Sequence, residues 1–338
     1  MNQNLFHYAT SELSQDAFIC WLLSHGTNEN KGTILYECAM TMLTEMCEHK
    51  CEPIEVKDIK RQYENIDVLV EVLADNKETY WFIIEDKTGT SVHDKQLERY
   101  IETVKTKKET AEDRIIGVYY KSGIQGVFSE VKNAGYHIMC RDKILCVLSK
   151  YVEDSKSEIL KDYYDNLNTA KIEAKQYKAL PYKDWDWPQI EAFFDSLMSD
   201  EEFMNRFVGF EYVANQNGGF IAMWNDGKKI TGKSWIMYLQ LEFKPHEAKI
   251  CLKGTVDEDE IKNYKTEGRA LLDMISLDGV YKFAPEFSRP KRLVSAHWMT
   301  LGVKGIDGAQ TEMEIRKSIV TAIGDYEKCV QRILPTNM

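Results

Sequence analysis

Two neighbouring apolar runs of strand length stand out in the first third of the chain. They are Ile66-Asp67-Val68-Leu69-Val70 and Trp81-Phe82-Ile83-Ile84-Glu85-Asp86-Lys87, with the polar segment Ala74-Asp75-Asn76-Lys77 between them. Runs rich in Ile, Val, Trp and Phe predict strands, and the polar segment predicts a turn, so a hairpin is expected. Side chains alternate across a strand with a period of two. Glu85 and Lys87 should therefore share one face with Trp81 and Ile83, while Asp86 points the other way.

The same reading predicts the remaining elements of the N-terminal half. We expect helices over 11–24, 33–46, 94–104, 142–152 and 158–176, and strands over 53–63, 66–74, 79–87, 114–120 and 136–140. The segment 180–188 has two Pro residues and no regular period, which makes it the best candidate for a domain boundary.

The C-terminal half has a pattern of its own. It predicts helices over 188–199, 257–275 and 310–333, and strands over 207–215, 219–224, 234–244, 248–253 and 293–302. This is an α+β arrangement around an antiparallel sheet. We therefore predict two domains, 1–180 and 181–338. The second contains no catalytic motif, and target recognition, dimerisation and partner docking all remain open as its role.

Asp67, Glu85 and Lys87 carry the clearest chemistry. Two carboxylates held close together bind a hard cation such as Mg²⁺, which lowers the pKa of a bound water and stabilises charge on a phosphoryl oxygen. A lysine two residues after the second acid can orient or activate that water, or neutralise the developing charge. An ordinary Glu-Lys pair at a strand end is the simpler alternative. However, Asp67 is flanked by apolar residues and Glu85 follows four of them. Placing a carboxylate among apolar residues costs free energy unless the carboxylate has a partner or a function. A phosphodiester hydrolysis site is therefore predicted.

Two flanking helices add polar residues at helical spacing. Gln96 and Tyr100 are four residues apart and lie on one side of the helix 94–104. Glu12 and Asp16 have the same spacing in the first helix. For Asp16, a favourable interaction with the helix N-terminus explains the acid at least as well as a role in a site.

Together these residues resemble the PD-(D/E)XK nuclease superfamily over roughly residues 5–150. The resemblance rests on the order of the N-terminal helix with its acid, the first strand acid, Glu85-Asp86-Lys87 and the helix Gln96-Leu97-Glu98-Arg99-Tyr100, which is similar to the exonuclease-like branch. Ile66 stands where a Pro usually precedes the first acid. The first helix followed by His25-Gly26 also resembles uncharacterised bacterial members.

The resemblance implies a fold and a set of roles. The expected fold is α/β (α+β), a restriction-endonuclease-like core with a central mixed sheet flanked by helices. Asp67 and Glu85 would bind Mg²⁺ (or Mn²⁺), with Glu12 helping at the metal site. Lys87 would be catalytic, and Gln96 and Tyr100 would line the site or contact DNA.

Charge modifies this picture without excluding it. The formal net charge of −11 opposes nucleic-acid binding, which relies on Lys and Arg, but a nuclease site is itself acidic before metal binds and local patches matter more than the sum. Candidate basic patches are Lys105–Lys108, Lys228-Lys229 with Lys233, and Arg289–Arg292. The second falls at an expected hairpin tip over 225–229, which could enter a DNA groove.

Composition also bears on location. No apolar stretch reaches membrane-spanning length, and the first residues lack a signal-peptide pattern. Eight scattered Cys residues without a paired framework suit a reducing cytoplasm. Cys47 and Cys51 have one possible metal spacing, but free thiols at a helix end explain them better.

The sequence therefore predicts a cytoplasmic, metal-dependent nuclease acting on DNA, in a setting such as restriction or phage defence. A binding module that keeps the fold without cutting is the alternative from another class. DNA against RNA, endonuclease against exonuclease action, and a possible homodimer are left open.

Overall fold

The computed structural model describes residues 3–89, 92, 95–216, 218–229, 235–256, 284–289, 294–295 and 298–333. The chain divides into two compact units, Met1–Ile172 and Glu173–Met338. Each unit has its own sheet and is described by itself.

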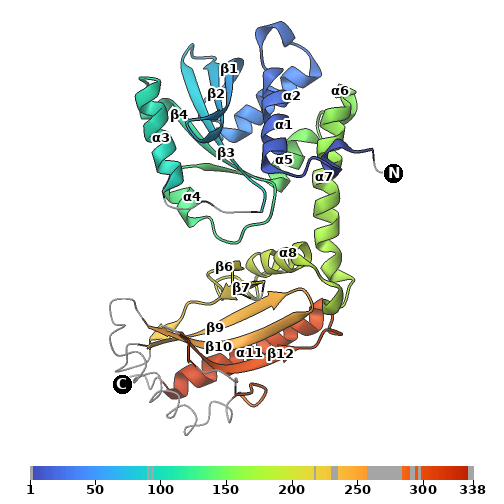
Figure 1. Cartoon of the computed structure of the whole chain (residues 1–338), viewed down its shortest axis with the longest axis vertical. Helices are drawn as coiled ribbons and strands as arrows, with labels where there is room; N and C mark the ends of the chain where they lie inside the picture. Colours follow the sequence, from blue (N-terminus) through green and yellow to red (C-terminus); the bar gives the residue numbers. More distant parts are fainter. Residues whose placement is uncertain are drawn as a thin grey trace. The chain divides into compact units, whose positions relative to one another are not determined.

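A five-stranded mixed sheet forms the centre of the first unit (Figure 1). Its strands, in spatial order, are β1 (Pro53–Tyr63), β2 (Ile66–Ala74), β3 (Thr79–Lys87), β4 (Ile115–Lys121) and β5 (His137–Cys140). The first three strands are antiparallel, and β4 and β5 run parallel to β3. The end of β3 is therefore central in the sheet, and the start of β2 lies beside it.

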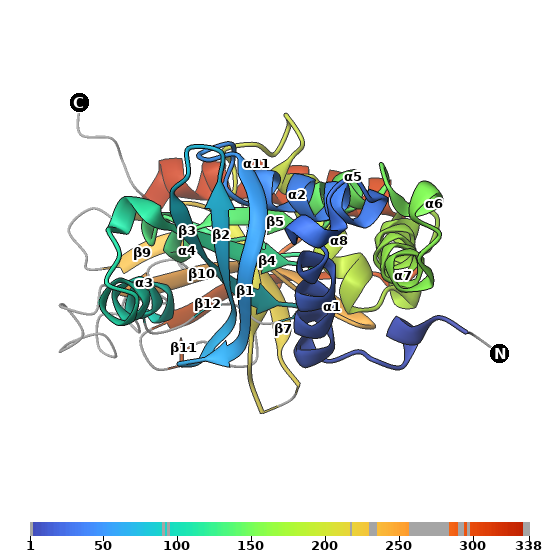
Figure 2. The ribbon, with the colours of Figure 1, turned by 90° about the horizontal axis from the view of Figure 1, so that it is seen from above.

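Helices cover both faces of this sheet (Figure 2). They are α1 (Glu12–Ser24), α2 (Ile34–Met46), α3 (Gln96–Lys107), α4 (Ser129–Asn133), α5 (Arg141–Leu148), α6 (Val152–Ser155) and α7 (Glu158–Ala174). Val68, Val70 and Phe82 pack in one core with side chains of α1, α2, α5 and α7. Leu69 and Ile83 belong to a second core with α3 and α4. The alternation of side chains from Val68 to Val70 and from Phe82 to Ile84 thus divides these residues between two cores.

A tight turn joins β1 to β2. Tyr63 pairs with Ile66, and the two residues between them have positive φ, 51° for Glu64 and 68° for Asn65. This pattern is typical of a type I′ hairpin turn, which Asn favours. The turn places Asp67 at the beginning of β2, one residue after the chain reverses.

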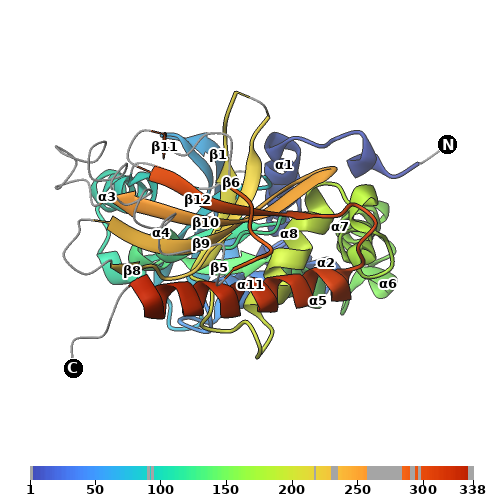
Figure 3. The same cartoon turned by 90° about the horizontal axis from the view of Figure 1, so that it is seen from below.

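The second unit is built on an antiparallel sheet. The described strands run in the order β11 (Val294–Ser295), β12 (Trp298–Ile306), β10 (Glu247–Val256), β9 (Trp235–Lys244), β7 (Phe220–Trp224) and β6 (Gly209–Val213), and β8 (Lys228–Lys229) also pairs with β9. The helix α11 (Glu312–Ile333) lies along the sheet (Figure 3), and its Tyr326 hydroxyl donates to the carbonyl of Met237. The other described α-helix is α8 (Trp187–Met198).

The segment 180–188 lies inside the second unit and contributes to its core. Tyr182 and Trp185 are almost fully buried, and the Trp185 indole donates to the carbonyl of Leu180. Asp186 and Gln189 form a reciprocal capping box that starts α8. The division between the two compact units falls earlier, inside α7.

The expected fold class is confirmed, with three local differences. The strand expected over 293–302 is two short runs, β11 and β12, which pair antiparallel with Val294 opposite Met299. The helix expected over 142–152 is split into α5 and α6, because Ser149 ends α5 and bonds back to the carbonyl of Cys146. The hairpin tip expected over 225–229 is wrong, because Lys228 and Lys229 already pair with β9. The helix expected over 257–275 lies outside the described residues, as do Lys233 and 290–292. Among the described residues, no helix has the length and apolar character needed to cross a bilayer.

Candidate active site

The ends of β2 and β3 bring two carboxylates and a lysine together. Val68 pairs with Ile84 across the two strands, so Asp67 and Glu85 come next in register. The Lys87 ammonium donates to Glu85 Oε1 and lies 4.0 Å from Asp67 Oδ2. Glu85 is fully buried. A buried carboxylate in its charged form requires a partner of opposite charge, and Lys87 provides one.

Gln96 and Tyr100 reach the site from α3. Gln96 Nε2 donates to Glu85 Oε1 at 2.9 Å and to the Tyr100 hydroxyl at 2.6 Å. That hydroxyl donates to the carbonyl of Asn65 at 2.6 Å. A continuous chain of hydrogen bonds therefore connects the buried carboxylate of β3 to the turn that begins β2.

Asp86 lies on the opposite face of β3, as the alternation predicted. Its Oδ1 accepts from Gln15 of α1, and Gln15 Oε1 accepts from the Tyr163 hydroxyl of α7 at 3.0 Å. The backbone N–H of Asp86 donates to Asp67 Oδ2 at 2.9 Å. The prediction that Glu85, and not Asp86, is the partner of Lys87 is confirmed by these contacts.

The two acids of α1 occupy different places. Glu12 Oε1 accepts from the backbone N–H of Thr88 at 2.9 Å, which places Glu12 at the end of β3. Asp16 Oδ2 accepts from Gln62 Nε2, and the same nitrogen donates to Asp67 Oδ1, both at 3.1 Å. Asp16 thus connects to the site through a glutamine and is more than a helix-end charge.

Gln62 and Gln15 were not foreseen as part of this site. Gln62 holds a left-handed backbone conformation, with φ of 54°, an uncommon state that clusters near functional sites. A signal for it exists in the sequence: with strands ending at 63 and beginning at 66, Gln62 falls opposite Asp67 in the hairpin. No comparable signal exists for Gln15, because its partner comes from a distant strand.

Burial and mutual repulsion perturb the acids. Burial, reinforced by the nearby charge of Asp67, raises the pKa of Glu85 to about 7 and that of Asp16 to about 6. Burial raises the pKa of Asp86 to about 9, although the bond from Gln15 opposes the shift. For Lys87, burial acts to lower the pKa, but the bond and charge of Glu85 outweigh it and the pKa is raised. Three of the carboxyl groups around the site therefore resist ionisation more than an exposed acid does.

The residues present fit a small divalent cation. Glu85 Oε2 is buried and has no hydrogen-bond partner, so one carboxylate oxygen is available beside Asp67. In the described ranges there is no group of three or more His, Cys, Asp or Glu side chains arranged as a metal cage. Mg²⁺ typically uses one or two carboxylates and takes its other ligands from water and substrate phosphates, which is compatible with the pair Asp67 and Glu85.

The other candidate features lie elsewhere. Cys47 and Cys51 are free thiols just after α2, with their Sγ atoms 3.9 Å apart. In the patch Lys105–Lys108, Lys105 pairs with Glu102 and Glu112, and Lys108 lies over the rings of Tyr63 and Trp81. Much of that positive charge is therefore already engaged within the unit.

The first unit is a restriction-endonuclease-like core. It has a mixed sheet with flanking helices, and it places two acids and a lysine at the adjoining ends of β2 and β3. A family model described as the PD-(D/E)XK nuclease superfamily matches residues 3–213, which is more than half of the chain. The chain belongs to the PD-(D/E)XK nuclease superfamily. Comparison with curated proteins and with solved structures gave no significant match. The family match extends past the first unit through α8 and β6 of the second.

Proposed function

We propose that this protein is a metal-dependent nuclease that hydrolyses phosphodiester bonds in DNA. The observation that supports this most strongly is the buried Glu85 carboxylate beside Asp67 and Lys87, with one oxygen left without a partner. Membership of the superfamily makes nucleic acid the expected substrate. The further expectation of a cytoplasmic role in restriction or phage defence rests on analogy with the family alone.

In this proposal Asp67 and Glu85 hold Mg²⁺ or Mn²⁺, and Glu12 supports the end of β3 through its bond to Thr88. When bound, the cation would supply Lewis-acid charge and lower the pKa of a water. Gln96 and Tyr100 fix the orientation of Glu85 relative to the β1–β2 turn. Their proposed role is to position the carboxylate, and direct contact with DNA remains an alternative for them.

Lys87 supplies a positive charge on the face where the phosphate must lie. Its ammonium is held by Glu85 and faces Asp67, so it acts as a hydrogen-bond donor. A donor in this place stabilises negative charge as water attacks phosphorus and the bond to the leaving oxygen breaks. This assigns Lys87 to electrostatic stabilisation and orientation of the water.

The direct test is cleavage of linear, circular and single-stranded DNA, and of RNA, with Mg²⁺ or Mn²⁺. The chain supplies a matched control for Lys87→Ala: Glu55-Val56-Lys57 in β1 has the same spacing, and Lys57 pairs with Glu55 at 2.7 Å outside the site. Cleavage should be lost in Lys87→Ala and in EDTA and kept in Lys57→Ala. Circular substrate separates endonuclease from exonuclease action. Equal activity in both variants, independent of metal, would refute the catalytic proposal.

The alternative is a binding module that keeps the fold without cutting, and the acidic composition is its main support. The change in folding stability on adding metal distinguishes the nuclease from the binding module. A site that binds Mg²⁺ or Mn²⁺ raises the stability of the folded chain, and Asp67→Asn should remove that gain. A chain that neither cuts nor gains stability from either metal fits the binding module.

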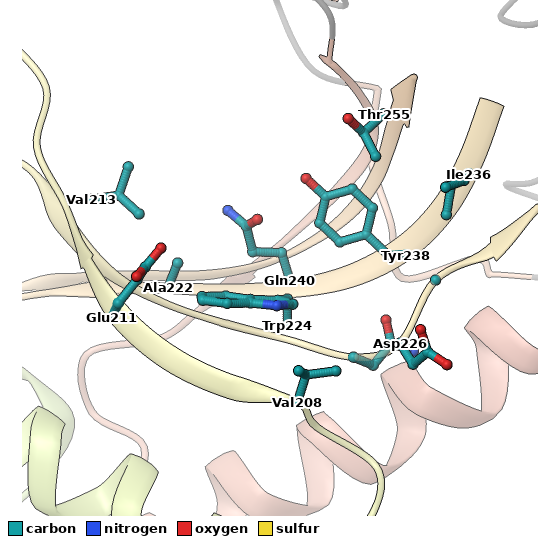
Figure 4. Close-up of a pocket in the computed structure, with 12 residues that line it drawn as sticks. Val208, Glu211, Val213, Ala222, Trp224, Asp226, Ile236, Tyr238, Gln240 and Thr255 are labelled. Atoms are coloured by element: carbon teal, nitrogen blue, oxygen red, sulfur yellow. The ribbon is translucent and has the colours of Figure 1, made fainter. Parts of the chain in front are cut away.

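For the second unit we propose a role in recognising the substrate. A pocket of about 460 Å³ lies in its sheet, lined by Trp224, Tyr238, Gln240 and neighbouring side chains. Figure 4 shows Tyr238 and Gln240 of β9 and Thr255 of β10 among the side chains at this pocket. Aromatic rings with adjacent polar groups suit stacking and reading of an unpaired base. Trp224→Ala should weaken binding of single-stranded DNA in EDTA, and unchanged binding would favour dimerisation or partner docking instead.

A further inference from the structure

A second, smaller pocket lies in the first unit on the α1 and α7 side of the sheet. It measures about 160 Å³, and Gln15, Thr88, Ser122, Arg141 and Tyr163 are among the residues that line it. Pockets for drug-sized ligands usually measure about 300–1,000 Å³. This pocket therefore suits a small group and is too small for a nucleoside.

Two hydroxyl groups at this pocket have no partner. Thr88 Oγ1 and Ser122 Oγ are buried, and neither makes a hydrogen bond within the structure. Ser122 as a residue is only 3 % exposed. Buried polar atoms are almost always satisfied in folded proteins, so a pair of unsatisfied hydroxyls lining one pocket points to a polar ligand.

The backbone holds these two residues close together. Lys87 and Lys121 pair at the ends of β3 and β4, and the N–H of Ser122 donates to the carbonyl of Lys87 at 3.3 Å. Thr88 and Gly123 approach so closely that a Cβ at position 123 would collide with the Thr88 carbonyl. The backbone positions of Thr88 and Ser122 are therefore fixed beside each other at the ends of β3 and β4.

The charged and dipolar groups at the pocket favour an anion. Arg141 lines it, and its Nε donates to the carbonyl of Ser122. Ser11, the N-cap of α1, also lines it and makes no side-chain capping bond. A helix N-terminus of this length favours negative charge. Two acids are close by. Glu12 accepts from the backbone N–H of Thr88, and Asp86 accepts from the side chain of Gln15.

We propose that this pocket binds a phosphate group of the nucleic-acid strand other than the one that is cleaved. The inference rests on the proposed nuclease function and deepens it. Thr88 directly follows Lys87. A nucleic-acid strand bound at the end of β3 therefore meets the cleavage site on one face of the sheet and this pocket on the other. The bound phosphate is either the terminal phosphate of a nucleic-acid strand or a neighbouring backbone phosphate. Both present at least two non-bridging oxygens, and the terminal phosphate has a third.

The test measures DNA binding in EDTA, so that cleavage plays no part. The probes are single-stranded oligonucleotides with a 5′-phosphate, a 3′-phosphate or only hydroxyl ends, with inorganic phosphate as competitor. Ser122→Ala removes an unsatisfied hydroxyl and should not lower stability, while Arg141→Gln removes the positive charge. Ser149→Ala and Arg114→Gln are matched controls, because Ser149 bonds to Cys146 and Arg114 pairs with Glu78 away from the pocket.

We expect Ser122→Ala and Arg141→Gln to weaken binding about tenfold, the effect of one lost charge-assisted hydrogen bond. A loss confined to one phosphorylated oligonucleotide identifies a terminal phosphate, and a loss for every oligonucleotide identifies a backbone phosphate. Unchanged affinity of Ser122→Ala for all probes overturns the proposal. If Ser122→Ala and Arg141→Gln weaken binding as expected while the wild type cuts no substrate, the nuclease proposal alone fails.

Discussion

At the scale of single residues, the hydroxyl of Tyr100 links the active site to the backbone. It accepts from Gln96 and donates to Asn65. We predict that Tyr100→Phe costs about 1 kcal/mol in stability, as is usual for one hydrogen bond, and lowers the cleavage rate about tenfold by loosening Glu85. Urea unfolding and cleavage kinetics measure the two effects.

Tyr136→Phe is the control for that substitution. Its hydroxyl donates to the carbonyl of Leu97, in the same helix α3, at 3.1 Å, but does not touch the acids. It should show a similar loss of stability with cleavage retained. Equal loss of activity in both variants would mean that α3 packing, and not the orientation of Glu85, controls the rate.

Asp86 gives a prediction about pH in the metal-free protein. Its pKa is raised from 3.8 to about 9 by burial. The folded chain therefore keeps a proton that the unfolded chain releases between about pH 4 and 9, and stability falls as pH rises through that window. Asp86→Asn, which cannot ionise, should be more stable than the wild type by at least about 1 kcal/mol near pH 8.

Denaturant unfolding in EDTA near pH 4.5 and pH 8 checks this. The advantage of Asp86→Asn should grow with pH. The exposed Asp113→Asn should show no such trend, because that side chain is not buried. An advantage that shrinks toward pH 8 would show that Asp86 is ionised and stabilising in the folded chain.

At the scale of elements, the hydrophobic pattern predicted the strands whose formation depends on neighbouring residues. The strands expected over 53–63, 66–74 and 79–87 match β1, β2 and β3. The second and third are bounded apolar runs, whereas the first carries Ile54, Val56 and Ile59 between charged residues. Alternation also separated Glu85 from Asp86, since the period of a strand does not depend on its neighbours. The pairing of Glu85 with Lys87 follows from that alternation.

What the sequence could not give are contacts between distant elements. Gln15 meets Asp86 across seventy-one positions of chain, and no local periodicity encodes that meeting. The break between α5 and α6 was missed because Val147, Leu148 and Val152 continue an apolar pattern through it. The hydroxyl of Ser149 competes with the backbone for hydrogen bonds and so favours a helix end. In the sequence this signal is weaker than the apolar pattern.

The sheet of the second unit contains a buried ion group that joins β9 to β10. Glu242 is 4 % exposed and lies 2.9 Å from Lys249 and 2.6 Å from Lys253. Burial acts to raise the pKa of Glu242, but the two lysines outweigh it and the pKa is lowered. We predict that Glu242→Gln costs about 3 kcal/mol near pH 7, because a partly buried ammonium loses its counter-charge.

The sign of the pH dependence follows. A carboxylate with a lowered pKa stabilises the fold above its ordinary value of 4.5 and loses that contribution as pH falls through the folded-state value. The difference between wild type and Glu242→Gln should shrink in acid. Glu247→Gln, which breaks an exposed pair with Lys244, should have almost no effect. Equal effects of both substitutions would contradict the argument.

At the scale of the whole molecule, the site and the ion group belong to different compact units. The carboxylates lie within Met1–Ile172, and Glu242 lies within Glu173–Met338. Chains with two such units often unfold in more than one step. A ligand that binds one folded unit stabilises that unit by mass action, so the two units can be perturbed separately.

We therefore predict two calorimetric transitions that respond to different changes. Mg²⁺ or Mn²⁺ at about a hundred times its dissociation constant should stabilise the first unit by about 2.7 kcal/mol and raise one transition. Asp67→Asn should abolish that rise. Glu242→Gln should lower only the other transition, with the metal response intact. A single transition that shifts with both the metal and Glu242→Gln would show that the units unfold together, and a metal response that survives Asp67→Asn would place the cation elsewhere.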